Sequence, residues 1–242
     1  MLHVSSLPNT ATLSLSASFL LAAYLTDHCW TPPNSNPTGP ASSLPKDTIA
    51  PVTAPLNILR FLTSALWLVQ TLIAFSYPSP PRAICPTPGN LNGQLFTWSP
   101  YTATVLVIIS ISAPIRLLAY KDLGENFTFR LARPKRLITT GLYAYVQHPS
   151  YPTLWLILAA NLGLLLRLDG VVGCILPTEV VTLGMGRGIL GIWHAGLVGF
   201  MGVGLYATWL RVRDEEVMMK EEFGKEWEEY HARTKRFVPG IF

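Results

Sequence analysis

Two separate stretches of the sequence carry residue types that could perform chemistry. The first, residues 141–152, reads GLYAYVQHPSYP and places His148 directly before Pro149. A proline there removes a backbone donor and leaves carbonyl groups that can line a cavity. The pattern is equally typical of a helix that simply begins at a membrane surface among tyrosines.

The second stretch begins at Arg211, where Glu215 and Glu216 directly follow an apolar run. Paired carboxylates can bind the cationic amino group of a cofactor, and arginines can bind a carboxylate. Taken alone, the stretch is more typical of a solvated helix with Glu and Lys at helical spacing. The two stretches are joined by a single apolar hairpin, and this combination favours a shared site.

The elements that must position these residues are apolar. Hydrophobic residues make up 50% of the 242 residues, charged residues only 13%, and the mean hydropathy is +0.34. A membrane span needs about 20 largely apolar residues. On that rule we predict an all-α, multi-pass transmembrane protein with about five spans and a cytosolic C-terminal helical tail. The predicted spans are Leu7–Leu25, Leu56–Tyr77, Tyr101–Ala119, Tyr151–Leu168 and Gly188–Leu210.

The distribution of charge predicts the orientation. Residues 211–242 hold 8 of the 14 Asp and Glu and 7 of the 18 Lys and Arg, and residues 116–136 form a second basic cluster. Basic residues beside spans favour the cytosol, so both stretches should face it, with Arg116 reaching the lipid headgroups. We expect a Pro-rich N-terminal transmembrane region over residues 1–115 and a catalytic region over 116–242.

Other partners and ligands are not indicated. The basic residues lie beside apolar runs, which fits a membrane surface better than nucleic acid. Cys29, Cys85 and Cys174 lie far apart without paired spacing, so neither a metal site nor a disulfide framework is expected.

The residues from Arg116 onward resemble the isoprenylcysteine carboxyl methyltransferases and the related phospholipid methyltransferases. Those proteins have a Gly-x-Tyr-x-x-x-Arg-His-Pro-x-Tyr-x-Gly motif, a helical hairpin, Arg-Ile-x-x-Glu-Glu, and a tail with Phe-Gly and spaced tyrosines. The upstream LGENFTF, residues 123–129, also resembles a family element. The matching residues here are Gly141, Tyr143, His148, Pro149, Tyr151, Arg211, Glu215, Glu216, Phe223, Gly224 and Tyr230.

This resemblance implies an enzyme that transfers a methyl group from S-adenosylmethionine to the carboxylate of a prenylated cysteine. It implies that the prenylated protein, or a small lipophilic substrate, enters from the bilayer to a site that faces the cytosol. We expect Arg211 and Gln147 to act in catalysis, and we expect an endoplasmic reticulum location. The implied cofactor-binding residues are Tyr143, His148, Pro149, Tyr151, Glu215 and Glu216.

Two departures from the family pattern leave the acceptor open. Gln147 stands where the family has Arg, and Thr153 where it usually has Gly. Glutamine keeps hydrogen-bonding capacity but lacks the fixed charge. A membrane methyltransferase for a lipid amine or a small metabolite therefore stays an alternative, as does a non-catalytic membrane scaffold derived from the family.

Overall fold

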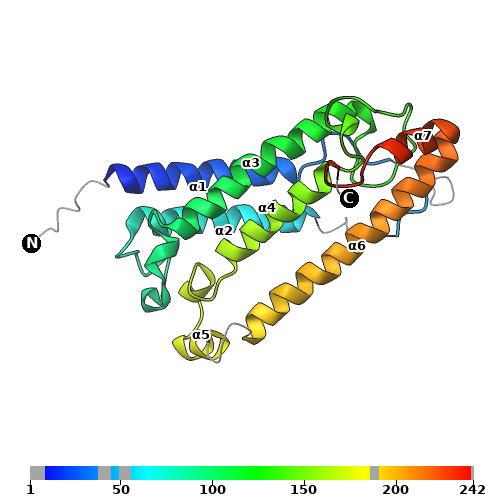
Figure 1. Cartoon of the computed structure of the whole chain (residues 1–242). Helices are drawn as coiled ribbons and strands as arrows, with labels where there is room; N and C mark the ends of the chain where they lie inside the picture. The colour runs from blue at the N-terminus through cyan, green and yellow to red at the C-terminus, as the bar shows by residue number, and fades with distance from the viewer. Residues whose placement is uncertain (1–8, 38–44, 49–55, 186–190, 241–242) are drawn as a thin grey trace, which may run out of the picture. The chain divides into compact units, whose positions relative to one another are not determined.

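The computed structural model describes residues 9–37, 45–48, 56–185 and 191–240 (Figure 1). These residues form α-helices joined by loops and short 3-10 turns, and no β-strand is present among them. The helices are α1 (Thr10–Cys29), α2 (Leu56–Ser76), α3 (Pro100–Leu123), α4 (Ser150–Leu165), α5 (Thr178–Met185), α6 (Ile192–Phe223) and α7 (Lys225–Arg233).

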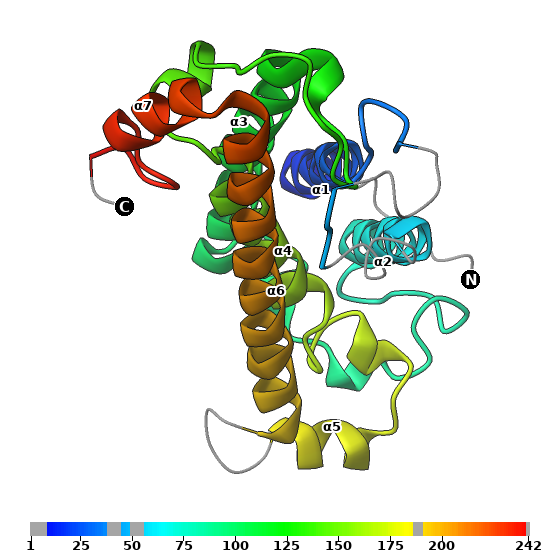
Figure 2. The same cartoon turned by 90° about the vertical axis from the view of Figure 1, so that its right-hand side faces the viewer.

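Local sequence signals explain where several helices begin and end. Before α1, the side chain of Asn9 accepts a hydrogen bond from the backbone N–H of Thr12 at 2.8 Å, as a helix N-cap should. Ser99 and Thr102 cap each other's backbone N–H groups at the start of α3. Gly224, with φ of +50°, ends α6 and lets the chain reverse into α7 (Figure 2).

Each of the five predicted membrane segments contains a helix, although residues 7–8 and 188–190 lie outside the described ranges. Among the described residues, three helical stretches are long and apolar enough to cross a membrane: Asn57–Ser76, Gly93–Asn126 and Ile192–Phe223. The all-helical, multi-pass prediction is therefore confirmed, whereas the count of five spans is not. The α1 helix is 20 residues long but is not among these stretches, and α4 is a shorter apolar helix.

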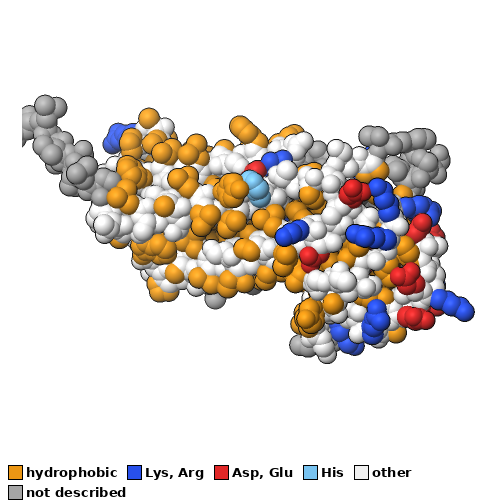
Figure 3. Space-filling model, turned by 90° about the horizontal axis from the view of Figure 1, so that it is seen from above, with side chains coloured by type: hydrophobic (Ala, Val, Ile, Leu, Met, Phe, Trp, Pro, Cys, Tyr) orange, Lys and Arg blue, Asp and Glu red, His pale blue; other side chains and the backbone are white. Residues whose placement is uncertain are grey.

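Figure 3 shows many hydrophobic side chains, in orange, on the face of the molecule that it presents. Phe61 on α2 is 73% exposed, and Val203 on α6 is 71% exposed. Exposed apolar surface of this extent is uncommon on soluble monomers. It agrees with helices whose outer faces contact lipid.

The chain divides into two compact units, which interleave along the sequence. The first comprises residues 1–27, 61–110 and 158–198, and the second residues 28–60, 111–157 and 199–242. A boundary near residue 115, expected from the sequence, stays a prediction. The first unit has an apolar core around Phe19, Trp67 and Leu164, in which Trp67 Nε1 donates to Asn161 Oδ1 at 2.7 Å.

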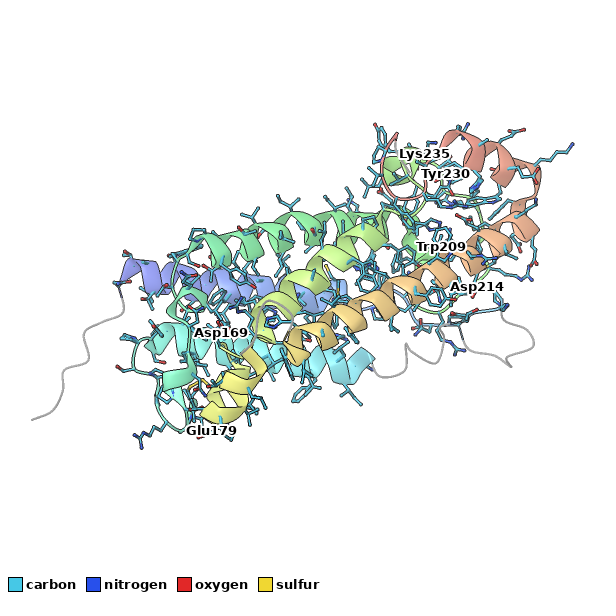
Figure 4. The ribbon with its side chains drawn as sticks, turned by 60° about the horizontal axis from the view of Figure 1, so that its bottom comes forward. Asp169, Glu179, Trp209, Asp214, Tyr230 and Lys235 are labelled. Carbon is cyan, nitrogen blue, oxygen red and sulfur yellow. A yellow bond between two sulfur atoms is a disulfide. The ribbon has the colours of Figure 1, made fainter. Side chains whose placement is uncertain are left out.

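A disulfide corrects our expectation for the cysteines. Within the first unit, Cys85 in the loop before α3 is bonded to Cys174 in the turn after α4 (Figure 4). The two residues are 89 positions apart in the sequence, so no short spacing motif could reveal their pairing. Cys29 is free and buried.

In the second unit, Arg116 is buried and only 5% exposed, which corrects its expected role as a headgroup anchor. Its Nη1 donates to the carbonyl of Ser150 at 2.8 Å, and its Nε to the carbonyl of Cys29 at 3.0 Å. A cationic donor thereby satisfies a carbonyl in the first turn of α4, directly after the His-Pro motif. Arg116 is a residue that positions this motif.

Candidate active site

The His-Pro segment is held between a tight turn and the C-terminal tail. The turn begins at Gly141, whose φ is +62°. A Cβ atom there would lie 2.3 Å from Oδ2 of Asp122, the atom that accepts the Leu142 N–H. Further on, the backbone N–H groups of Gln147 and His148 donate to the carbonyls of Lys235 and Arg236, at 2.8 and 2.9 Å. The segment therefore holds His148 against the tail just before α4 begins.

His148 lies beside both carboxylates that the sequence singled out. Its Nδ1 is 3.2 Å from Oε2 of Glu215, and its Nε2 is 3.8 Å from Oε1 of Glu216. The other oxygen of Glu215 accepts hydrogen bonds from the Tyr151 hydroxyl at 2.6 Å and from Arg211 Nε at 3.0 Å. The structure thus brings together the two stretches that we expected to share a site.

The electrostatics of this cluster favour a charged histidine. Burial by itself lowers the pKa of His148, but its hydrogen bond to Glu215 and the two nearby carboxylates raise it above the usual 6.5. The Nε2 atom is buried and has no hydrogen-bond partner among the described residues. It is therefore a donor that a bound group could satisfy.

Glu216 faces a second cation from the tail. Arg236 binds it with both Nε and Nη2, at 2.5 and 2.9 Å, in the bidentate geometry that makes arginine–carboxylate pairs strong. The guanidinium of Arg236 also lies 5.7 Å from the ring centroid of Trp209. Figure 4 labels Trp209 and Asp214 on α6 and Tyr230 and Lys235 in the tail.

Arg211, an expected catalytic residue, is 4% exposed and bound by two carboxylates. In addition to Glu215, its Nη1 donates to Oδ2 of Asp47 at 2.6 Å. Asp47 also accepts the backbone N–H of Leu131 at 3.0 Å. Sequence reasoning missed Asp47, because it stands in a Pro-rich connector with no motif around it.

Gln147, the other expected catalytic residue, is turned toward the tail. Its Nε2 donates to the carbonyls of Thr234 at 2.5 Å and His231 at 3.4 Å, and its Oε1 lies 2.9 Å from His231 Nδ1. Both amide donors and the acceptor oxygen are therefore occupied within the protein. Gln147 therefore attaches the end of α7 to the His-Pro segment.

Tyr143, a predicted cofactor residue, lies behind the cluster. Its ring is 6% exposed, and its carbonyl accepts a hydrogen bond from the Tyr230 hydroxyl at 2.7 Å. Burial and the negative charge of Glu215 raise its pKa well above 10, so the phenol stays neutral. Pro149 lies immediately before α4, which begins at Ser150.

A groove adjoins the cluster at Glu216. Its volume is about 290 Å³, close to the lower end of small-molecule sites, which span roughly 300–1,000 Å³. The α6 helix provides cations, a carboxylate and an apolar side chain, and α7 provides an indole and an imidazole whose ring centroids are 5.4 Å apart. The lining residues are Arg213, Glu216, Val217, Lys220, Trp227, Glu228 and His231.

These features define an all-helical membrane protein with a buried histidine–carboxylate cluster next to a groove lined by charged, aromatic and apolar side chains. Residues 103–187 match the model of the isoprenylcysteine carboxyl methyltransferase (ICMT) family. The matched range includes the His-Pro motif and ends before α6, so Arg211 and the glutamates lie outside it. Comparison with curated proteins gives no match.

Proposed function

We propose that this protein is a methyltransferase that uses S-adenosylmethionine and methylates the carboxylate of a prenylated cysteine. The observation that carries the proposal is the position of His148 between Glu215 and Glu216, next to the groove. The family match supports it, because the matched range covers the His-Pro motif.

The groups around the groove fit this cofactor chemically. Glu216 supplies a carboxylate for the cofactor's ammonium group, and Arg236 or Arg213 a guanidinium for its carboxylate. Trp227 and His231 offer aromatic faces on which an adenine ring can stack. The Nε2 of His148, which lies 3.8 Å from Glu216 and makes no hydrogen bond among the described residues, is a further donor beside this carboxylate.

In the proposed reaction the protein positions and desolvates its substrates. When bound, S-adenosylmethionine supplies an electrophilic methyl group on a cationic sulfur. An acceptor carboxylate is already ionised near neutral pH, so the chain need not provide a general base. His148, Glu215 and Glu216 hold the cofactor side of the site, and the surrounding apolar helices exclude water from the anion.

Arg211 is proposed to bind the acceptor carboxylate after that carboxylate displaces Asp47. Its Nη1 already binds Asp47, so an acceptor carboxylate would replace that side chain at the guanidinium. Gln147 is too fully engaged by the tail for direct contact with the acceptor, and its proposed role is to hold the tail. The tail supplies Arg236, so Gln147 acts on the site through that residue.

The test is a methyl-transfer assay on purified protein in detergent. It compares a farnesylcysteine analogue, a phosphatidylethanolamine and a reaction without acceptor, together with calorimetric binding of S-adenosylmethionine. We expect cofactor binding and turnover of the farnesylcysteine analogue alone. Turnover of the amine alone would overturn the proposal that the acceptor is a prenylcysteine carboxylate. Absence of cofactor binding by folded protein would overturn the proposed enzymatic activity and support the scaffold alternative.

The proposed membrane placement follows the same chemistry. The cluster and the groove are built from residues that neighbour the two basic stretches, and such stretches favour the cytosolic face. We therefore propose an integral membrane protein of the endoplasmic reticulum whose active site faces the cytosol. The prenyl chain would reach this site from the bilayer.

A further inference from the structure

The disulfide joins two loops that are distant in sequence. Cys85 follows α2, Cys174 follows α4, and both side chains are fully buried. Thr87 donates from its backbone N–H and its hydroxyl to the carbonyl of Cys174, at 3.1 and 2.7 Å. Asn90 Nδ2 donates to the carbonyl of Gly173 at 2.9 Å. The disulfide is therefore surrounded by hydrogen bonds that join the same two loops.

The same junction is supported by a charge pair one turn earlier. Arg167 binds Asp169 with Nε and Nη2, at 2.7 and 2.6 Å, and Asn92 Nδ2 donates to Asp169 at 3.0 Å. Burial by itself raises the pKa of Asp169, but these hydrogen bonds and the Arg167 charge lower it. A Cβ on Gly173 would lie 2.1 Å from the Leu168 carbonyl, so this turn has room only for glycine.

We propose that Cys85 and Cys174 are an oxidative modification site, and that the loops carrying them face the oxidising side of the membrane. Disulfides persist in the lumen of the endoplasmic reticulum and outside the cell, but rarely in the cytosol. As the sulfur–sulfur bond forms, the two thiols release two protons and two electrons. The disulfide of a lumenal thiol–disulfide oxidoreductase accepts the electrons and becomes a dithiol.

The connectivity of the helices agrees with this placement. The α3 span separates Cys85 from the His-Pro segment, and the α6 span separates Cys174 from the tail. The disulfide keeps the loop before α3 and the turn after α4 on the same side of the membrane. The bridge between Val146 and Lys235 keeps the His-Pro segment and the tail together on one side. Both conditions are met only if α4 also crosses the membrane.

The α4 helix is short for a crossing but sufficient. Its 16 residues span about 24 Å at 1.5 Å per residue, whereas the hydrocarbon core of a bilayer is about 30 Å thick. Local thinning of the bilayer accommodates a short span at modest cost. Leu166 extends the apolar stretch by one residue beyond the helix, before Arg167.

Two features of the sequence provide independent checks on this orientation. Residues 77–99 contain a single Lys or Arg, Arg82, whereas residues 120–149 contain five, as expected if the second segment is cytosolic. Asn126-Phe127-Thr128 is the one Asn-x-Ser/Thr acceptor in the sequence without an intervening proline. It lies in the segment assigned to the cytosol, so it should carry no glycan.

The thiols are counted in protein from sealed microsomes. Free thiols are labelled with a maleimide polymer after denaturation, with and without prior reduction. We expect one labelled thiol without reduction, from Cys29, and three after reduction. The Cys85→Ser variant should show two thiols without reduction, because Cys174 loses its partner. Three labelled thiols in unreduced wild-type protein would overturn the proposal, and this count requires no variant to fold.

The sidedness is tested with a membrane-impermeant maleimide on intact microsomes, in a Cys29→Ala background. A cysteine introduced by Lys135→Cys should be labelled at once, and one introduced by Arg82→Cys only after detergent is added; both native side chains are exposed. The wild type should show no mobility shift with an endoglycosidase. The reverse labelling pattern, or a glycan that Thr128→Ala removes, would overturn the orientation. None of these readouts depends on methyl transfer.

Discussion

Arg211 Nη1 donates a 2.6 Å hydrogen bond to Oδ2 of Asp47, which joins the Pro-rich connector to α6 at the candidate site. The pair is nearly excluded from solvent, with exposed side-chain fractions of 4% and 7%. Removal of either partner would leave the other with an uncompensated charge in a poorly solvated environment. This relationship makes Asp47 part of the site's architecture, although no motif contains it.

We predict that Asp47→Ala lowers the free energy of unfolding by about 3–5 kcal/mol, the usual cost of breaking a buried ion pair. Thermal unfolding in detergent would measure it. The control is Asp214→Asn, because Asp214 accepts an exposed hydrogen bond from the Thr48 N–H and an amide oxygen can replace it. Equal, small effects of the two substitutions would contradict the structural role of the pair.

The proposed exchange at Arg211 predicts a kinetic effect of the milder variant Asp47→Asn. A neutral amide competes less well than a carboxylate for the guanidinium, so the KM for a farnesylcysteine analogue should fall while kcat changes little. Steady-state kinetics would show this. An unchanged KM in a folded variant would mean that Arg211 remains bound to residue 47 throughout the reaction.

The His148 cluster predicts a pH-dependent contribution to stability. A group whose pKa is raised on folding stabilises the folded state fully below its unfolded value, near 6.5, and loses this effect as pH rises through the raised value. The wild type should therefore exceed His148→Gln in stability most at acidic pH, with a smaller difference at alkaline pH. Unfolding curves over that range would reveal the opposite sign if His148 were neutral when folded.

Cofactor binding is predicted to depend on Glu216. Loss of a charge-assisted hydrogen bond typically costs about 1.5–3 kcal/mol, so Glu216→Ala should weaken S-adenosylmethionine binding roughly ten- to hundredfold. Calorimetry on the folded variant measures this, with Glu229→Ala as a control on the exposed face of α7. Unchanged affinity in both Glu216→Ala and His148→Ala would remove the basis for the proposed pocket.

Gln147 is predicted to control the attachment of the tail. Gln147→Ala removes two donors and one acceptor from contacts with His231 and Thr234, and each such hydrogen bond contributes about 1 kcal/mol. Trypsin should then cleave faster after Lys235 and Arg236, as mass spectrometry of timed digests would show. Gln94→Ala, at an exposed loop position, is the control, and equal cleavage rates in both variants would contradict this role.

The sequence predicted most of the helices because each requires only local information. Apolar runs near the length of a span, separated by Pro-rich connectors, mark α1, α2 and α3. The pairing of His148 with Glu215 was also accessible, because one hairpin connects the two stretches. The exact span count was less accessible, since α4 ends at Leu165 and falls short of a standard crossing.

What the sequence by itself determined is an all-helical membrane protein, because hydropathy is a local property. It also predicted that His148 lies near Glu215 and Glu216, because a single hairpin joins the two stretches. The tertiary structure decided the partners of those residues. The contacts of Arg211 with Asp47 and of Cys85 with Cys174 join residues 164 and 89 positions apart. Such contacts depend on how loops pack in three dimensions, and no period or spacing in the chain encodes them.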